Sequence, residues 1–344
     1  MLIIVNNVAA KARQSWPKIK SQLDAADLEF KTCFTNQKGD ATVQTSVALN
    51  SGTQLIVVVG GDGTLSEAAQ GFFAFNDNLD LPPLPINPSA TLAVLPAGTG
   101  DDFARGLRRK RAVLDEWIET LVAHVRAGES QRETTNDYRP SEVRHGVSEV
   151  RNDDRRAAQR IDVLYGRCDG LQTPFICLNA STMGIGGETA SRVAAQGGFM
   201  RKFSGEFRFV FAAVGALAAW RERRVRVVVD DQTIADGPMN LVGVANGLYA
   251  GGGMMFSPEA RLDDGLLDVV TASGLSRANV VTELSRIHTG GHLNNPKVSL
   301  TQGRKVRIET LLLKDGMLIE ADGNVRGVTP VEFQVMPGAL RFLT

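Results

Sequence analysis

The sequence has few cysteines, no excess of either charge and no long apolar run. Its three cysteines among 344 residues are scattered, without Cys-x-x-Cys spacing, which indicates a reducing cytoplasm and argues against a zinc site. Lysine plus arginine (38) balance aspartate plus glutamate (38), so no overall positive field attracts nucleic acid. The longest apolar block, residues 207–220, would span about 21 Å as a helix. A bilayer core needs roughly 30 Å, so we expect no transmembrane segment.

The order of apolar and polar segments predicts two domains of different class. Residues 1–127 alternate β-branched runs with helical patterns, which is typical of a parallel sheet covered by helices. Residues 161–335 contain many short apolar runs separated by Gly and Asp turns, which predicts a β-rich, antiparallel, sandwich-like domain. Between them, residues 128–160 are almost wholly polar. They predict a solvated helical or disordered insertion or linker, with a partner-docking segment as the alternative.

In the first domain the predicted strands and helices leave glycine-rich segments at strand ends. The expected strands are residues 2–6, 28–34, 55–60 and 92–96. The expected helices are residues 10–25, 40–51, 65–75 and 112–127. Ligands of such sheets bind beyond the carboxyl ends of the strands, which is where the glycine-rich segments lie.

The first glycine-rich segment, residues 60–64, reads Gly-Gly-Asp-Gly-Thr. Its glycines permit close backbone approach, so a phosphate could meet successive N–H groups and the helix dipole. Thr64 and Glu67 have the spacing of a capping box, which predicts a helix start beside the loop. The segment is not a Walker A motif, because no Gly-Lys-Ser/Thr follows it, and it is not the Rossmann fingerprint, because Ser66 stands where the third glycine belongs. A tight structural turn is the alternative.

The second segment, residues 92–107, repeats this design. An apolar strand is followed by Gly98-Thr99-Gly100, and then by two aspartates that open an Arg-rich helix. Two glycine loops at two strand ends could close on one nucleotide. A plain helix N-cap is the alternative for Asp102.

Together these residues resemble the diacylglycerol kinase catalytic family, which includes bacterial lipid kinases and sphingosine kinases and is distantly related to NAD kinases. GGDGT at 60–64 and LPAGTGDDFAR at 95–105 are similar to its two signatures, and residues 179–188, 244–270 and 320–327 match later blocks in the same order. The resemblance covers nearly the whole chain apart from 128–160. It implies an NAD-kinase-like and diacylglycerol-kinase-like fold in which the C-terminal segment 336–344 packs back on the first domain.

The resemblance also implies a nucleotide site. Its expected residues are Asn6, Thr35, Gly60, Gly61, Asp62, Gly63, Thr64, Gly98, Thr99 and Asp102. The chain departs from the family where Asn7 replaces the usual Pro and Asp101 the usual Asn. An extra carboxylate near phosphates must be offset by Mg²⁺ or by a cation, for which Arg105 is the expected residue.

Asp62 places a carboxylate where an anion is expected to bind. Phosphoryl transfer needs a divalent metal to spread charge and an oriented acceptor. We therefore interpret Asp62 as a metal-linked or hydroxyl-orienting residue. The alternative is an Asx-turn that satisfies its own loop amides.

Two later segments carry the other predicted site residues. By resemblance, the acidic turn at 260–270 holds a structural Mg²⁺ through the Asp264 carboxylate and the carbonyls of Arg261 and Leu266. A plain β-turn with solvated acids is the alternative there.

Residues 322–324 read Asp322-Gly323-Asn324, where related lipid kinases have Asp-Gly-Glu and the glutamate is assigned as proton acceptor. An asparagine cannot take that proton, and loss of a general base typically costs about 10²–10⁴ in rate. Asp62, or else Asp322, is expected to serve instead. Glu320 is on the same face but about 13 Å along an extended strand.

The sequence thus predicts a cytoplasmic, membrane-peripheral lipid kinase that uses ATP and Mg²⁺. The apolar block 207–220, flanked by arginines, is expected to be core, or else to contact acyl chains or an anionic membrane. The alternatives are a nucleotide-binding regulator with weak or no kinase activity, suggested by Asn324, and an NAD-kinase-like enzyme with a soluble acceptor. The sequence does not identify the lipid, or decide between a monomer and a homodimer.

Overall fold

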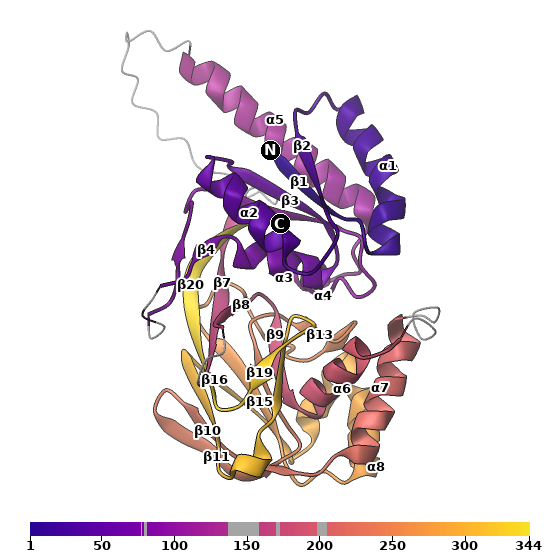
Figure 1. The fold of residues 1–344 in the computed structure, drawn as a ribbon, viewed down its shortest axis with the longest axis vertical. Helices are drawn as coiled ribbons and strands as arrows, with labels where there is room; N and C mark the ends of the chain where they lie inside the picture. The colour runs from indigo at the N-terminus through magenta and orange to yellow at the C-terminus, as the bar shows by residue number, and fades with distance from the viewer. Residues whose placement is uncertain (77, 79–80, 137–157, 170–172, 198–204) are drawn as a thin grey trace.

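The protein combines an N-terminal α/β layer with a C-terminal β-rich part, and the predicted fold class is confirmed (Figure 1). The computed structural model describes residues 1–344 except 77, 79–80, 137–157, 170–172 and 198–204. The described helices are α1 (Ala10–Ala25), α2 (Asp40–Asn50), α3 (Asp62–Gln70), α4 (Asp102–Arg108), α5 (Leu114–Asn136), α6 (Ile185–Ala194), α7 (Gly205–Ala219) and α8 (Arg277–Arg286).

The strands divide between the two parts of the chain. Those of the first part are β1 (Leu2–Asn6), β2 (Lys31–Thr35), β3 (Leu55–Gly60), β4 (Phe73–Ala74), β5 (Leu84–Pro85) and β6 (Thr91–Pro96). Those of the second part are β7 (Ala158–Cys168), β8 (Phe175–Cys177), β9 (Ala180–Gly184), β10 (Arg223–Val229), β11 (Gln232–Met239), β12 (Leu241–Ala245), β13 (Tyr249–Ala250), β14 (Met254–Met255), β15 (Leu267–Ala272), β16 (Val298–Gly303), β17 (Lys305–Thr310), β18 (Leu318–Ala321), β19 (Asn324–Val328) and β20 (Val331–Leu343).

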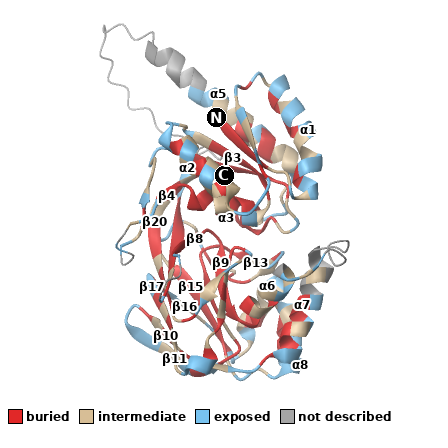
Figure 2. Cartoon of the chain, viewed as in Figure 1, coloured by how far each residue is buried: buried red, intermediate tan, exposed pale blue. Residues whose placement is uncertain are grey.

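The first part is a parallel sheet in the order β2-β1-β3-β6. Consecutive residues such as Ile3 and Ile4 are both fully buried. Because successive side chains of a strand point to opposite faces, both faces of this sheet must be covered, as Figure 2 shows. This is why its strands are continuous apolar runs rather than alternating ones.

The second part stacks two sheets. A six-stranded sheet has the order β16-β15-β12-β9-β18-β19, and its apolar side chains pack against those of β7, β10, β17 and β20. The core between them is built from alternating residues, such as Val225 and Val227 in β10, which are fully buried. This alternation is the pattern expected of strands that bury one face in a sandwich.

Strand β20 joins the two parts. Its first half pairs antiparallel with β17, whereas Arg341 and Phe342 pair parallel with Thr91 and Leu92 of β6. A single ten-stranded sheet therefore runs through both parts of the molecule (Figure 1). This continuous backbone pairing fixes where the carboxyl ends of β3 and β6 lie relative to the second part.

The segment expected to be a polar insertion is only partly described. Helix α5 continues to Asn136, beyond the expected end at residue 127, and β7 begins at Ala158. The expectation for residues 137–157 lies outside the described part of the chain.

Helix α7 contains most of the apolar block. Ala216, Leu217 and Trp220, which follows the helix, are buried, whereas Phe211 and Val214 are 59% and 61% exposed. The block therefore contributes to the core on one side and leaves large apolar side chains exposed on the other. Among the described helices, none is long and apolar enough to cross a bilayer.

Candidate functional site

Helix α3 begins directly after β3, at the first glycine loop. Its first residue is Asp62 and its N-cap is Gly61, so the helix starts three residues earlier than expected. The predicted capping box is wrong: Thr64 Oγ1 accepts a hydrogen bond from Asn6 Nδ2 (2.7 Å), and Glu67 Oε2 accepts one from the amide of Gly39 (3.0 Å). Both side chains instead tie α3 to neighbouring loops.

The carboxyl ends of β1 and β2 lie beside this loop. Asn6 pairs with Thr35 across the two strands, and its Oδ1 accepts the amides of Val8 and Ala9. Because Asn6 also donates to Thr64, one side chain holds both the β1–α1 turn and the start of α3. The predicted positions Asn6 and Thr35 are thus at the same sheet edge as the first glycine loop.

The two glycine loops touch each other. A Cβ added to Gly98 would lie 2.5 Å from Gly61 Cα, and one added to Gly61 would lie 2.9 Å from Gly98 Cα. Real Cβ atoms do not approach backbone this closely. Glycine is therefore required at both positions for the loops to pack together, whether or not a ligand is bound.

Asp62 holds the second loop in place. Its two carboxylate oxygens accept the amides of Asp102 and Phe103, each at 3.0 Å, at the start of α4. This contact reaches across to another loop, so it is not the self-contained Asx-turn of the alternative, and the metal-linked or hydroxyl-orienting role of Asp62 stays a prediction. Burial, with the nearby Asp102 carboxylate as a second cause, raises the pKa of Asp62 to about 7.

Several backbone amides in and after the second loop already donate hydrogen bonds to carboxylates of the protein. Gly98 N donates to Asp101 Oδ1 (2.8 Å), and the two amides that follow Asp101 are bound by Asp62. Lys11 Nζ, which also donates to the carbonyl of Gly98, lies 3.5 Å from Asp101 Oδ2. Lys11 rather than Arg105 therefore makes the direct ion pair with Asp101. Burial raises the pKa of Asp101, and the charges of Lys11 and, to a smaller extent, Arg105 oppose that rise. This pairing offsets the extra carboxylate that distinguishes the second loop.

Asp102 connects this loop to the second part of the chain. Its Oδ2 accepts the amide of Gly252 (2.7 Å), in the turn between β13 and β14. It is the first residue of α4, with Asp101 as the N-cap, so the plain N-cap alternative is wrong. Its Oδ1 is buried without a hydrogen-bond partner. Burial raises the pKa of Asp102 as well, so an unsatisfied acidic oxygen lies between the glycine loops and the β13–β14 turn.

Two further contacts close the second part against α3. The side-chain amide of Gln70 exchanges hydrogen bonds with the backbone of Ile176 in β8, and Arg326 in β19 reaches Ser66 Oγ at 3.4 Å. Asn324 Nδ2 lies 3.9 Å from the point that a Cβ on Gly63 would occupy. The predicted residue Asn324 therefore faces the first glycine loop.

Strands β18 and β19 form a tight hairpin, which the sequence analysis missed. Asp322 and Gly323 both have positive φ, at 47° and 80°, and Ala321 pairs with Asn324. The expected separation of about 13 Å between Glu320 and position 324 is wrong, because the chain reverses between them. The Asp-Gly dipeptide between two β-rich runs was the available signal for such a turn.

Asp322 has a structural role. It is 7% exposed, and its carboxylate accepts the amides of Leu178 (2.8 Å) and Asn179 (2.9 Å) and the thiol of Cys177 (3.3 Å). A carboxylate bound by three donors inside the sandwich anchors the hairpin to the β8–β9 connection. We therefore do not retain Asp322 as a proton acceptor.

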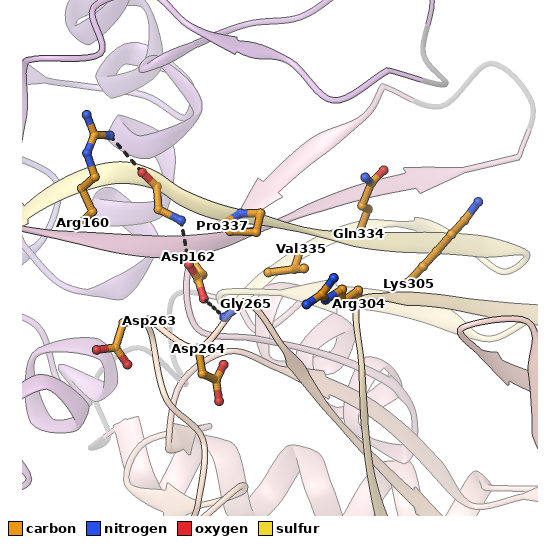
Figure 3. Close-up of a pocket in the computed structure, with 11 residues that line it drawn as sticks. Arg160, Asp162, Asp263, Asp264, Gly265, Arg304, Lys305, Gln334, Val335 and Pro337 are labelled. Carbon is orange, nitrogen blue, oxygen red and sulfur yellow. Dashed lines mark hydrogen bonds between the residues drawn. The ribbon is translucent and has the colours of Figure 1, made fainter.

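The acidic turn borders an open cavity of about 750 Å³, and the residues that line this cavity do not include the two glycine loops (Figure 3). Its lining includes the acidic residues Asp263 and Asp264 and the basic residues Arg160, Arg304 and Lys305. Asp264 Oδ1 accepts the amide of Leu266 (3.0 Å), and Asp263 lies 3.3 Å from Arg261.

Asp162 is the residue that sequence reasoning missed at this turn. It is 2% exposed and accepts the amides of Gly265 (2.6 Å) and Gly338 (2.7 Å), so it fastens the turn to β20. Its signal was an acid inside the apolar run 161–165. Within the described ranges, no three His, Cys, Asp or Glu side chains converge closely enough to hold a metal ion. The Mg²⁺ site at Asp264, Arg261 and Leu266 stays a prediction.

Comparison with known proteins assigns both halves of the chain. Residues 1–131 match the diacylglycerol kinase catalytic domain, and residues 182–344 match the YegS C-terminal NAD kinase beta sandwich-like domain. A probable YegS-like lipid kinase of Xanthomonas oryzae is 30% identical over 264 residues, which are 77% of this chain and 70% of that protein. The chain belongs to the diacylglycerol kinase and YegS-like lipid kinase family. This confirms the resemblance inferred from the sequence.

Other members of the lipid kinase family share most of their length with this one. A diacylglycerol kinase of Mycobacterium tuberculosis is 26% identical over 314 residues, which cover 88% of this chain and 81% of the relative. The crystal structure of a putative diacylglycerol kinase from Bacillus anthracis matches 99% of this chain and 96% of its own, with a TM-score of 0.66 at 21% identity. At that identity the structural match supports the fold alone. Family membership assigns kinase chemistry at the level of the family.

Proposed function

We propose that this family member transfers the γ-phosphoryl group of ATP to a hydroxyl group of a membrane lipid such as diacylglycerol, in a reaction that requires Mg²⁺. The observation that carries the proposal is the junction at Asp62 and Asp102. Asp62 binds the second glycine loop to the first, and Asp102 binds that loop to the β13–β14 turn. A nucleotide bound at the first loop would therefore lie beside acidic groups and next to the second part of the chain.

The nucleotide phosphates would bind at the N-terminus of α3. The amides of Gly98, Asp102 and Phe103 in and after the second loop are occupied by carboxylates, whereas Gly63, in the first turn of α3, is exposed. A helix N-terminus attracts phosphate through its free N–H groups and its dipole. Asn6, Thr35 and Thr99 remain proposed nucleotide contacts.

The residues present fit a magnesium ion near these phosphates. Asp102 Oδ1 is a buried acidic oxygen without a partner, and the pKa of Asp62 is raised partly by the charge of Asp102. A hard divalent cation prefers carboxylate oxygens and would relieve this repulsion. Bound Mg²⁺ neutralises charge that develops on the transferring phosphoryl group. The side chains of Asp62 and Asp102 would hold it, and the hairpin at Asn324 would face the acceptor.

The exposed side of α7 supports work at a membrane surface. Phe211 and Val214 are exposed apolar side chains on one helix face, spaced to lie together. A peripheral contact of this kind would give the enzyme access to a lipid without a membrane span. A cytoplasmic, membrane-peripheral location is part of the proposal.

The test is transfer of labelled γ-phosphate from ATP to vesicles that contain diacylglycerol, a sphingoid base or phosphatidylglycerol, with and without Mg²⁺. The native chain is expected to label at least one lipid, and Asp62→Asn to label it at least about 100-fold more slowly. ADP binding and thermal unfolding of each variant are measured in parallel. Full activity of Asp62→Asn would remove the role given to that carboxylate.

A nucleotide-binding regulator is the second candidate, because Asn324 cannot accept a proton. It predicts ADP binding without any labelled lipid, and a gain of activity in Asn324→Glu. Competition by NAD but not by lipid vesicles would instead indicate an NAD-kinase-like enzyme.

A further inference from the structure

Strand β19 contains a β-bulge at Arg326. Its neighbours Val325 and Gly327 pair with consecutive residues of β18, so Arg326 is the extra residue of the bulge. Bulges re-aim a side chain and are over-represented next to active sites. The guanidinium of Arg326 crosses the boundary between the two parts of the chain and donates a hydrogen bond to Ser66 Oγ in α3 (3.4 Å). The second part of the chain thus places a positive charge on α3.

This contact lies close to the start of α3. Ser66 follows Gly63 by three residues, so the two lie on the same side of the helix, about 4.5 Å apart along its axis. Asn324, on the same strand as Arg326, faces Gly63. Strand β19 therefore meets α3 at two neighbouring points, at the end of the hairpin that is directed toward the first part of the chain (Figure 1). A phosphate bound at the exposed Gly63 would lie within reach of the long Arg326 side chain.

The guanidinium of Arg326 has unused hydrogen-bonding capacity. It carries five N–H donors, and among the described residues it makes one hydrogen bond, to Ser66. Its Nε is buried without a partner. The ring centroid of Phe175 in β8 lies 5.5 Å from the guanidinium carbon, a contact that uses no donor. A buried donor without a partner is costly, and an anion bound at this point would supply the acceptor.

Two other cations near the glycine loops have partners of their own. Lys11 pairs with Asp101 at 3.5 Å, and Arg105 donates to the carbonyl of Gly100 at 3.4 Å. Both act on the second glycine loop. Arg326 instead contacts the helix that begins at the first loop, where the phosphates are proposed to bind.

The acid on the neighbouring strand leaves this guanidinium available. Glu320 of β18 accepts its hydrogen bonds from the hydroxyl of Thr182 (2.7 Å) and from the amide of Gly323. Burial raises the pKa of Glu320 to about 7, and the charge of Arg326 is among the influences that oppose this rise. Within the described residues the two side chains feel each other's charge but form no hydrogen bond.

We propose that Arg326 binds the terminal phosphate of the nucleotide at the start of α3. The assignment rests on the lipid kinase function proposed above. During transfer the lipid hydroxyl oxygen bonds to the γ-phosphorus, the bond from that phosphorus to the β–γ bridging oxygen breaks, and ADP leaves with the bonding electrons. The hydroxyl proton passes to Asp62, the base expected from the sequence, and then to solvent. Arg326 exchanges no proton: its donors meet the negative charge of the terminal phosphate, which Asp62 and Asp102 would repel.

The experiment compares ADP with AMP-PNP, an ATP analogue that keeps a terminal phosphoryl group, each in the presence of Mg²⁺. The chains are native, Arg326→Gln, Arg326→Lys and the matched control Ser66→Ala, and thermal unfolding of each is measured. Arg326→Gln is expected to weaken AMP-PNP binding about 10- to 150-fold, the range for hydrogen bonds to a charged group, while ADP affinity stays within about threefold. Arg326→Lys keeps the charge but loses the planar fork, so it should weaken AMP-PNP alone, by at least about threefold.

Ser66→Ala separates a phosphate contact from a purely structural one. It removes the partner that Arg326 has in the structure but keeps the guanidinium, so both affinities should stay close to native. If Arg326 only holds the hairpin on α3, Ser66→Ala should reproduce the effect of Arg326→Gln, and both nucleotides should be weakened equally. Either result would overturn the proposal, as would native AMP-PNP affinity in Arg326→Gln. If Arg326→Gln fails to fold, native AMP-PNP affinity in Arg326→Lys would overturn it.

Phosphate transfer gives a second readout. With the lipid that the native chain accepts, Arg326→Gln should lower kcat by about 10²–10³, as loss of one donor to developing charge typically does, whereas Ser66→Ala should keep the native kcat. A native chain that binds both nucleotides but labels no lipid would overturn the proposed function, while the ratio of the two affinities would still decide the contact of Arg326. Native labelling combined with native AMP-PNP affinity in Arg326→Gln would overturn the contact alone.

Discussion

Gly98→Ala tests whether the two glycine loops are packed against each other as described. The added Cβ would lie 2.5 Å from Gly61 Cα and 2.6 Å from Asp101 Oδ1, about 1 Å inside ordinary contact. The obstacle is backbone on one side and a carboxylate held by Gly98 N on the other, so no flexible side chain can absorb it. Overpacking of this kind costs about 1–3 kcal/mol. We expect the free energy of unfolding to fall by that amount in guanidinium titrations.

The same strain should weaken nucleotide binding. If the variant relieves the clash by separating its loops, restoring their contact around a nucleotide would cost the same 1–3 kcal/mol, or about 5- to 150-fold in ADP affinity. Gly63→Ala is the matched control, because the nearest atom to its Cβ is 3.9 Å away and alanine favours the helix by up to about 1 kcal/mol. It should keep or raise stability while still weakening ADP binding through the exposed first turn of α3. A Gly98→Ala chain with native stability and native ADP affinity would refute the packing argument.

Three further changes test other contacts of the site. Because the pKa of Asp62 is raised to about 7 from its ordinary value of about 3.8, ionised Asp62 opposes folding increasingly as pH rises from 4 to 7. The stability of Asp62→Asn relative to native should therefore increase over that range by up to about 4 kcal/mol, in urea titrations at both ends; a constant difference would contradict the shift. Asp322→Ala leaves the amides of Leu178 and Asn179 without an acceptor and should cost about 1–3 kcal/mol for each, visible as faster hydrogen exchange at those amides. Gln70→Leu leaves the backbone groups of Ile176 without their side-chain partner and should cost about 1–3 kcal/mol for each group. If the Ile176 amide is equally protected from hydrogen exchange in the native and variant chains, the contact is not made.

Much of the fold could be predicted from local patterns, because strands buried on both faces read as continuous apolar runs. Residues 2–6 and 55–60 are strands with the predicted bounds. The start of α3 could not be read in the same way. Thr64 and Glu67 have capping-box spacing, yet Asn6 and Gly39 compete for them from other parts of the chain. Tertiary hydrogen bonds decided the outcome, and spacing along the sequence carries no information about them.

In the candidate site, too, local sequence features could be predicted and tertiary contacts could not. The glycine loops and their acids could be located from sequence, but the partners of those acids could not. Asp62 binds amides that are 40 and 41 residues away, and Asp102 binds one that is 150 residues away. Only Asp101 binds a nearby amide, three residues away. The hairpin at Asp322-Gly323 was within reach of local reasoning, since its dipeptide favours a type I′ turn. Missing it led to the wrong expected separation between Glu320 and position 324.

The position of Asp62 on a phosphate loop is explained by the contacts that it makes. A carboxylate there binds the amides that would otherwise make the second loop an anion site, so it directs phosphate to the start of α3 and keeps the two loops together. Burial and the charge of Asp102 raise the pKa of Asp62 to about 7. The hydrogen bonds from the Asp102 and Phe103 amides are therefore made to a carboxylate whose surroundings favour protonation. A cation bound at the free oxygen of Asp102 would lower that pKa and strengthen the charged form of the contact. Metal binding and loop closure would then stabilise each other, so Mg²⁺ should tighten ADP binding in the native chain by more than in Asp62→Asn, and an equal effect in both would show that the two are not coupled.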